Sequence, residues 1–418
     1  MPFSVPSAVS DCAYLAPWVL PASGHVLGPG AGLVVRGGQV RACASGVSTV
    51  RRLARAEGVP VVDLERGVLT AGLINAHSHL ELFGLAGKVP ATGGFGAWVQ
   101  RLIQVRANAP AQVLSDGAAR GAARLIETGT TTVGDIDSLG VVGPALRRSG
   151  LRMVCYRESL DAQDGERTQS ELVRLARPRV DGPRWCEGLS PHAPFTVSPQ
   201  LMEGLAAIAG ARRLPVTVHW SETQAEVDWM EGRESPLQAL LGAGPGRSGL
   251  DLIQACGLLG SRTSLVHGNL PQAGELERIQ DAGASVVHCP GSHRFFQRAA
   301  FPLSRYRALG IGLALGTDSA ASNDDLDMRR EMQLACQEFS CLEPDDAWKM
   351  ATEGGAQALG QAHRLGVLRP GMAADMAWFD SDVSSRDTVV EGLVRGIPDC
   401  LGSWVAGQRL YPRLDPRF

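Results

Sequence analysis

The stretch Ala71-Gly-Leu-Ile-Asn-Ala-His77-Ser-His79-Leu80 begins as an apolar run and ends in two histidines separated by one residue. Side chains alternate faces along an extended strand, so His77 and His79 point to the same side. Two imidazoles on one face at a strand end are suitable metal ligands. The pair by itself could equally be two unrelated histidines. The rest of the chain therefore has to supply further ligands.

The composition is that of a soluble globular protein. The chain has 418 residues, 44% hydrophobic and 20% charged, with a net charge of −3, so neither nucleic acid nor an anionic membrane is an expected partner. Its nine cysteines are scattered, without a C-x-x-C pair, which argues against a disulfide framework. The early apolar run at 13–20 contains a proline and is too short to cross a bilayer. We expect a cytoplasmic protein.

The middle of the chain alternates apolar strands with helical patterns. Helices are predicted at 112–127, 199–211 and 272–282. Eight strands in this rhythm predict a (β/α)8 barrel. The alternative is an open doubly wound sheet, which a Gly-x-Gly-x-x-Gly after the first strand would favour, and that motif is absent. The predicted strands are 72–75, 131–135, 152–157, 187–190, 215–219, 264–267, 285–288 and 310–316.

The two ends of the chain resemble each other more than they resemble the middle. Residues 1–70 and 366–418 both read as short strands and turns, including a Gly-Gly hairpin signal at Gly37 and Gly38. We therefore predict a small discontinuous β-sandwich made from both ends. Residues 71–365 would form a distorted catalytic barrel.

Seven of the nine histidines lie at or just beyond a predicted strand end, the rim that forms the active face of such a barrel. His219 ends one strand and is followed three residues later by Glu222. His267 ends the next strand, and Asp318 follows the last. Glu222 also suits the first turn of a helix, and a lone strand histidine is usually a core residue. Taken together, these residues suit one metal ion with a position left for water.

These residues resemble the amidohydrolase superfamily in order and spacing. Secondary motifs agree: Gly129-Thr-Thr-Thr-Val-Gly-Asp, Ser190-Pro-His-Ala-Pro-Phe-Thr, His288-Cys-Pro-Gly-Ser, Gly371-Met-Ala-Ala-Asp and Val405-Ala-Gly-Gln. No lysine falls at the end of the fourth strand, where His192 lies, so the chain looks like the mononuclear branch. This resemblance implies one divalent ion, zinc or alternatively iron. Its implied ligands are His77, His79, His219 and Asp318.

The resemblance also implies catalytic roles, with His267 polarising the water, Asp318 taking its proton and Glu222 protonating the substrate. Within the superfamily, His219-x-x-Glu222 is similar to the deaminase and chlorohydrolase group. The implied reaction is hydrolytic deamination of an aminated purine, pyrimidine or nucleoside derivative, such as aminofutalosine or adenosylhomocysteine. The alternatives are hydrolysis of an amide, imidazolone or carbon–halogen bond, and a scaffold that has lost its chemistry.

Substrate contacts are expected where the chain departs from its relatives, at Leu80-Glu81-Leu82 and around Cys289-Pro-Gly-Ser-His293-Arg294. Arg157 or Arg294 could bind a carboxylate of the substrate, although each could also be a surface residue. The expected partner is a small molecule, and the sequence leaves a homodimer open. The residues expected to bind substrate are Glu81, Trp98, Arg157, His192, His293 and Arg294.

Overall fold

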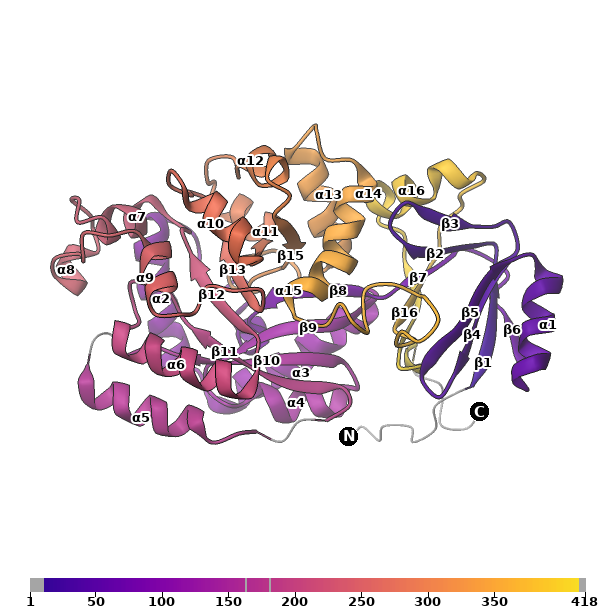
Figure 1. Cartoon of the computed structure of the whole chain (residues 1–418), viewed down its shortest axis with the longest axis horizontal. Helices are drawn as coiled ribbons and strands as arrows, with labels where there is room; N and C mark the ends of the chain where they lie inside the picture. Colours follow the sequence, from indigo (N-terminus) through magenta and orange to yellow (C-terminus); the bar gives the residue numbers. More distant parts are fainter. Residues whose placement is uncertain (1–10, 162–163, 180–181, 413–418) are drawn as a thin grey trace.

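The computed structural model describes residues 11–161, 164–179 and 182–412. Its centre is a sheet of eight parallel strands in sequence order from β8 to β15. A bridge between Ser78 and Asp318 brings the two edges of the sheet together, so the barrel is nearly closed (Figure 1). All eight predicted strands are confirmed. They are β8 (Leu73–Ser78), β9 (Thr130–Asp137), β10 (Arg152–Ser159), β11 (Trp185–Pro191), β12 (Val216–Trp220), β13 (Thr263–His267), β14 (Ser285–His288) and β15 (Gly312–Leu315).

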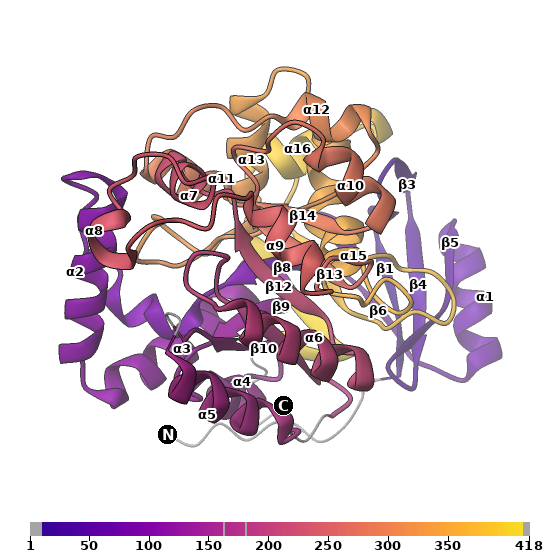
Figure 2. The same cartoon turned by 60° about the vertical axis from the view of Figure 1, so that its left-hand side comes forward.

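Helices cover the outside of the barrel, and their apolar faces form one large cluster with the outward side chains of the strands (Figure 2). The three predicted helices appear as α3 (Ala111–Glu127), α6 (Pro199–Arg212) and α10 (Glu275–Ala282). The other helices of the barrel region are α2 (Gly94–Asn108), α4 (Val142–Ser149), α5 (Gly165–Ala176), α7 (Gln224–Met230), α8 (Gln238–Leu241), α9 (Gly249–Ala255), α11 (Pro290–Phe295), α12 (Leu303–Ala308), α13 (Met328–Glu338), α14 (Pro344–Lys349) and α15 (Gly355–Ala358), with the short turns η1 (Leu80–Leu85) and η2 (Met350–Gly354).

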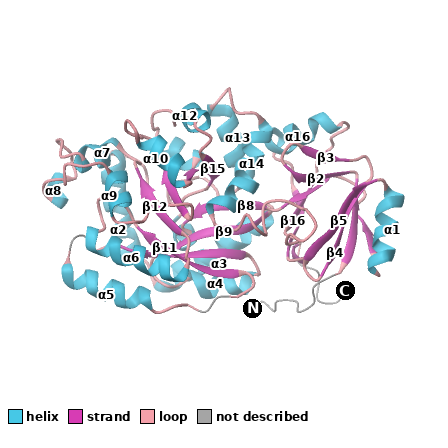
Figure 3. Cartoon of the chain, in the orientation of Figure 1, coloured by secondary structure: helices cyan, strands magenta, loops and turns pink. Residues whose placement is uncertain are grey.

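Strands from both chain ends form two further sheets beside the barrel (Figure 3). The six-stranded sheet has the order β18-β17-β16-β7-β2-β3 and mixes both ends, whereas the four-stranded sheet, β5-β4-β1-β6, is entirely N-terminal. Apolar side chains of both sheets pack in one core. The strands are β1 (Cys12–Ala16), β2 (Trp18–Ala22), β3 (His25–Leu27), β4 (Ala31–Arg36), β5 (Gln39–Ser45), β6 (Val61–Asp63), β7 (Val68–Ala71), β16 (Met376–Phe379), β17 (Cys400–Val405) and β18 (Gln408–Tyr411), with the helix α1 (Val47–Glu57).

The sandwich built from both ends is therefore confirmed as part of the fold. The boundaries placed at 70/71 and 365/366 stay predictions. The C-terminal elements η3 (Arg386–Thr388) and α16 (Val389–Gly396) lie beyond residue 366, yet α16 packs against α13 and α14 of the barrel region. Among the described residues, no helix is long and apolar enough to cross a membrane.

A buried ion pair joins the barrel to the terminal sheets. Arg152, the first residue of β10, donates from Nε and Nη2 to the two carboxylate oxygens of Asp375 at 2.7 and 3.0 Å. The same carboxylate accepts the backbone N–H of Ala406 at 2.8 Å. Both side chains are almost fully buried, and every contact is charge-assisted.

Candidate metal and catalytic site

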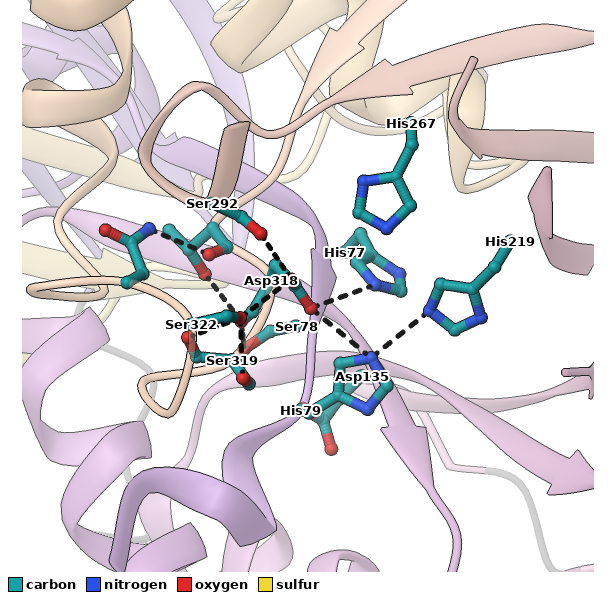
Figure 4. A network of polar contacts seen from close by, with 12 residues as sticks. His77, Ser78, His79, Asp135, His219, His267, Ser292, Asp318, Ser319 and Ser322 are labelled. Carbon is teal, nitrogen blue, oxygen red and sulfur yellow. Dashed lines mark hydrogen bonds and ion pairs between the residues drawn. The ribbon is translucent and has the colours of Figure 1, made fainter. Parts of the chain in front are cut away.

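The strand that opens the barrel carries a β-bulge at the two histidines. Asn75 of β8 pairs with Val133 of β9, and Ser78 pairs with Asp135. Between these two pairs β8 therefore has one residue more than β9. A bulge bends a strand and re-aims its side chains. His77 and His79 both point into the barrel mouth, with ring centroids 4.9 Å apart (Figure 4).

His219, the fourth residue of β12, completes a group of three imidazoles. Its Nδ1 lies 2.8 Å from the backbone carbonyl of His192, which can only accept, so Nδ1 carries the proton. The lone pair of His219 is therefore on Nε2, and this atom lies 3.3 Å from Nε2 of His79. Such a carbonyl contact is the usual way in which a protein orients a metal-binding histidine.

Asp318 faces the same point from the loop after β15. Its Oδ1 lies 3.8 Å from Nε2 of His77 and 3.6 Å from Nε2 of His79. Its Oδ2 accepts hydrogen bonds from the hydroxyls of Ser292 and Ser322 at 2.7 and 2.8 Å. One oxygen is thus held by hydroxyls, while the other is directed toward the imidazoles (Figure 4).

The donor set fits a transition metal. Both ring nitrogens of His77 are buried without a hydrogen-bond partner among the described residues, an arrangement that costs free energy unless a ligand fills it. Ligand atoms of His77, His79 and His219 lie within 4.8 Å of one another. Burial lowers the pKa of His77, and it lowers the pKa of His79 to about 3. The imidazoles of His77 and His79 are therefore neutral near pH 7, the form that binds a metal.

Two further groups border this cluster. His267, the last residue of β13, has its Nε2 3.6 Å from Oε1 of Glu222. Glu222 lies in the loop after β12, where the carboxylate of Glu226 accepts the backbone N–H groups of Ser221 and Glu222, each at 2.8 Å. Burial is the main influence on the pKa of Glu222 and raises it. A buried carboxyl with a raised pKa suits proton transfer near neutral pH.

Backbone strain gathers around the same cluster. Ser221, His267 and Asp318 adopt φ values of 51°, 73° and 55°, a region that residues other than glycine seldom occupy. Such conformations usually persist where the surrounding structure requires them, often at functional sites. Here they turn the ends of three neighbouring segments toward the barrel mouth.

Arg157 was expected to bind substrate, but its side chain points away from the barrel mouth. Strand β10 continues past it to Ser159, so Arg157 stays inside the sheet and faces the helical layer. Its Nη1 donates to Glu187 at 2.7 Å and to the carbonyl of Arg177 at 2.8 Å. The next residue, Glu158, points into the barrel, where its carboxylate lies within 4.8 Å of ligand nitrogens of His192 and His219.

The prediction for the loop after β14 is also corrected. His293 is buried and faces α13, with Nε2 3.6 Å from Glu338, and its ring lies 5.3 Å from that of His288. Arg294 is exposed on α11. Another residue of the loop, Arg298, reaches the site and contacts Glu222. The sequence prediction missed it because three residues of helix and turn, 295–297, separate it from Arg294.

The remaining predicted contacts lie at or near the mouth. Glu81, in η1, is buried and pairs with Arg106 of α2 at 3.1 Å. His192 lies within the cluster, with Nδ1 2.7 Å from the hydroxyl of Thr196. Trp98 is a core residue of α2, and its indole donates to the Val89 carbonyl at 3.2 Å. Its indole packs against Phe296, and the expectation that it contacts substrate stays a prediction.

The barrel mouth has two chemically different halves. The ends of β12 to β15 carry the proton-transfer candidates Glu222, His267 and Asp318. The ends of β8 to β11 carry Glu81 and Glu158, whose Oε2 and Oε1 atoms are buried without a hydrogen-bond partner among the described residues. The other oxygen of Glu158 accepts from Ser138 at 2.6 Å, and burial raises the pKa of Glu81 to about 7. This second half therefore offers acceptors to a bound molecule.

Comparison with known proteins agrees with this geometry. Residues 68–406 match the model of the amidohydrolase family. The chain is 31% identical over 348 residues, 79% of each sequence, to a 5-methylthioadenosine/S-adenosylhomocysteine deaminase of Pyrococcus furiosus. It is 28% identical over 358 residues, 82% of this chain and 81% of the relative, to a 5'-deoxyadenosine deaminase of Methanosphaera stadtmanae.

The fold also matches that of a zinc-bound adenosine deaminase from Xanthomonas campestris, with a TM-score of 0.82 and 25% identity over 97% of this chain and 93% of that one. The chain belongs to the amidohydrolase family. It is a hydrolase of carbon–nitrogen bonds other than peptide bonds, of the deaminase type.

Proposed function

We propose that this protein hydrolytically deaminates an adenosine analogue modified at the 5' position, with one zinc ion held by His77, His79, His219 and Asp318. The observation that carries the proposal is the placement of Glu222 and His267 beside the metal-ligand cluster, 3.6 Å apart. The named activities of the relatives from Pyrococcus and Methanosphaera support the same substrate class. The bound zinc in the Xanthomonas structure supports the choice of metal.

A zinc ion at this site would lower the pKa of a water molecule and orient it for attack. Oδ2 of Asp318 is held by two serine hydroxyls, which fixes the direction of Oδ1; this second oxygen would serve the ion as a ligand and take a proton from the attacking water. Glu222 would donate its proton to the ring nitrogen beside the amine-bearing carbon. It would then take the remaining hydroxyl proton of the added water and pass it to the amine, which leaves as ammonia, and the proton held by Asp318 would restore Glu222. His267 would hold the attacking oxygen through Nε2.

The acidic half of the mouth would hold the part of the substrate that does not react. Glu158 has a buried carboxylate oxygen with no partner among the described residues, and Glu81 has another. A carboxylate is a common acceptor for sugar hydroxyls, because both its oxygens can accept hydrogen bonds. A nucleoside therefore fits this half better than a free base or a halogenated triazine.

The test is ammonia release from a substrate panel by the zinc-loaded protein. The panel contains 5'-deoxyadenosine, 5-methylthioadenosine, S-adenosylhomocysteine, adenine, cytosine and a chlorinated triazine. We expect turnover of one or more of the three nucleosides at a kcat/KM well above that for the free bases. Chloride release from the triazine, without ammonia release from any nucleoside, would replace deamination with hydrolysis of a carbon–halogen bond.

A further inference from the structure

Arg298 lies in the loop after α11, where two distant parts of the chain meet above the metal-ligand cluster. Its side chain is 10% exposed. The guanidinium donates both to Oε1 of Glu222 and to the backbone carbonyl of the same residue. We propose that Arg298 is a positioning residue for Glu222, and that it connects this carboxylate to helix α2. The inference rests on the proton-transfer role proposed above for Glu222.

The guanidinium fork suits this double contact. Arginine presents several N–H donors in a rigid plane, so one side chain can hold a carboxylate and a carbonyl together. The backbone of Glu222 is already fixed by Glu226, and by Asn269, which donates to its carbonyl at 3.0 Å. Among the described residues, Arg298 is the hydrogen-bond donor to the side chain. Without it, the three side-chain torsions of Glu222 would have to be fixed by the substrate itself.

Arg298 is itself held by aromatic rings. Its guanidinium carbon lies 5.0 Å from the ring centroid of Phe95 and 4.8 Å from that of Phe296. These distances are within the range of cation–π attraction. The two rings meet edge to face at 5.3 Å, and Trp98 packs against Phe296 at 5.0 Å. Because Phe95 and Trp98 belong to α2, the position of this helix is transmitted through Arg298 to Glu222.

A cavity of about 290 Å³ lies on the outer side of this arrangement, and Phe95, Phe295, Phe296 and Arg298 are among its lining residues. Arg298 thus separates an aromatic cavity from the proton-transfer carboxylate. A movement of α2 would change the cavity and the contact with Glu222 together.

The charges around Glu222 predict a second effect. Burial raises the pKa of this carboxyl, and the positive charge of Arg298 opposes that rise. The other charged or titratable groups that face it are His219, His267, Asp318 and Glu226. Removing the arginine takes away the larger of the two positive influences that lower this pKa and leaves burial and Asp318, which raise it, with His219 as the smaller opposing one. The pKa of Glu222 should therefore increase in a variant that lacks Arg298.

The experiment compares Arg298→Gln and Arg298→Lys with wild type, with Arg294→Gln as the control, an exposed arginine four residues earlier. We expect Arg298→Gln to lower kcat about 10- to 100-fold, the size expected for a lost charge-assisted contact, with KM within about threefold. The limb of the pH profile that reports Glu222 should move to higher pH. Arg298→Lys should be intermediate, and Arg294→Gln should match wild type.

A readout without substrate separates this inference from the proposed function. The carboxyl band of Glu222 can be titrated by infrared difference spectroscopy, with Glu222→Gln to assign it. An upward shift of its pKa in Arg298→Gln supports the inference even if no adenosine analogue is turned over, a result that would sink only the proposed function. An unchanged titration, or an effect confined to KM, would overturn the positioning role.

Discussion

Arg157 and Glu158 are neighbours on β10, yet they belong to two different regions of the molecule. Arg157 faces the wall between the strands and the helices, where its donors contact Glu187 and backbone carbonyls. Glu158 faces the barrel mouth and keeps one buried oxygen without a partner among the described residues. Burial alone therefore does not distinguish the two regions. The difference lies in the terminal atoms of the two side chains: both Nη atoms of Arg157 donate to partners within the chain, although its Nε has none among the described residues, whereas Oε1 of Glu158 has none.

The same contrast separates Arg152 from His77. The Arg152–Asp375 pair is bidentate and shares its carboxylate with a backbone N–H, so its main polar atoms have partners. His77 is also buried, and neither of its ring nitrogens has a hydrogen-bond partner among the described residues. A satisfied buried pair stabilises a unique packing arrangement, whereas an unsatisfied group is available to a ligand. The following variants test this division.

The largest effect is expected for the ligand cluster. Asp318→Asn and His219→Ala should each lower kcat/KM by at least about 10³-fold. The first variant removes a charged ligand and proton acceptor, and the second removes an imidazole ligand of the metal ion. Circular dichroism and the thermal midpoint of the metal-free protein should stay close to wild type. Activity within about tenfold of wild type for either variant would mean that the ligand set is wrong.

A stability effect is expected on the outer wall. Arg157→Met should lower the free energy of unfolding by about 1.5–3 kcal/mol, because Glu187 loses one charge-assisted partner while Arg212 stays paired with its other oxygen. Urea denaturation of the metal-free protein measures this change. The folded fraction should keep the wild-type KM. A raised KM with unchanged stability would instead place Arg157 in the substrate site and break the comparison.

A smaller effect is expected inside the mouth. Glu158→Gln should lower kcat/KM for 5'-deoxyadenosine about 10- to 100-fold, because a charge-assisted acceptor becomes a neutral one. Its unfolding free energy should change little, in contrast to Arg157→Met. The 2',3'-dideoxy form of the substrate should show a much smaller loss. Equal losses for both substrates would remove Glu158 from sugar binding.

The smallest effect is expected for Arg294→Gln on α11. This side chain is exposed, so kcat/KM should stay within about twofold of wild type. The free energy of unfolding should stay within about 0.5 kcal/mol. Steady-state kinetics and urea denaturation measure both quantities. A substantial loss of activity would restore the original prediction that Arg294 binds substrate.

The sequence was sufficient to predict the eight strands and the residues that meet at their ends. The reason is that parallel strands bring their carboxyl ends to one rim, so order along the chain becomes position around the barrel. It was insufficient for Arg157, because β10 runs two residues beyond the predicted end. Arg298 was missed because its position depends on a helical turn followed by a loop, and no local pattern reports that geometry.

The central claim is that the imidazoles of His77, His79 and His219 hold one catalytic ion. The most direct measurement is elemental analysis of the chelator-treated and zinc-reconstituted protein, combined with activity at each metal ratio. We expect about one zinc per chain, with deaminase activity rising in proportion until that ratio is reached. The His77→Ala variant should retain neither the metal nor the activity. Full activity in metal-free protein, or stoichiometric zinc in His77→Ala, would contradict the account.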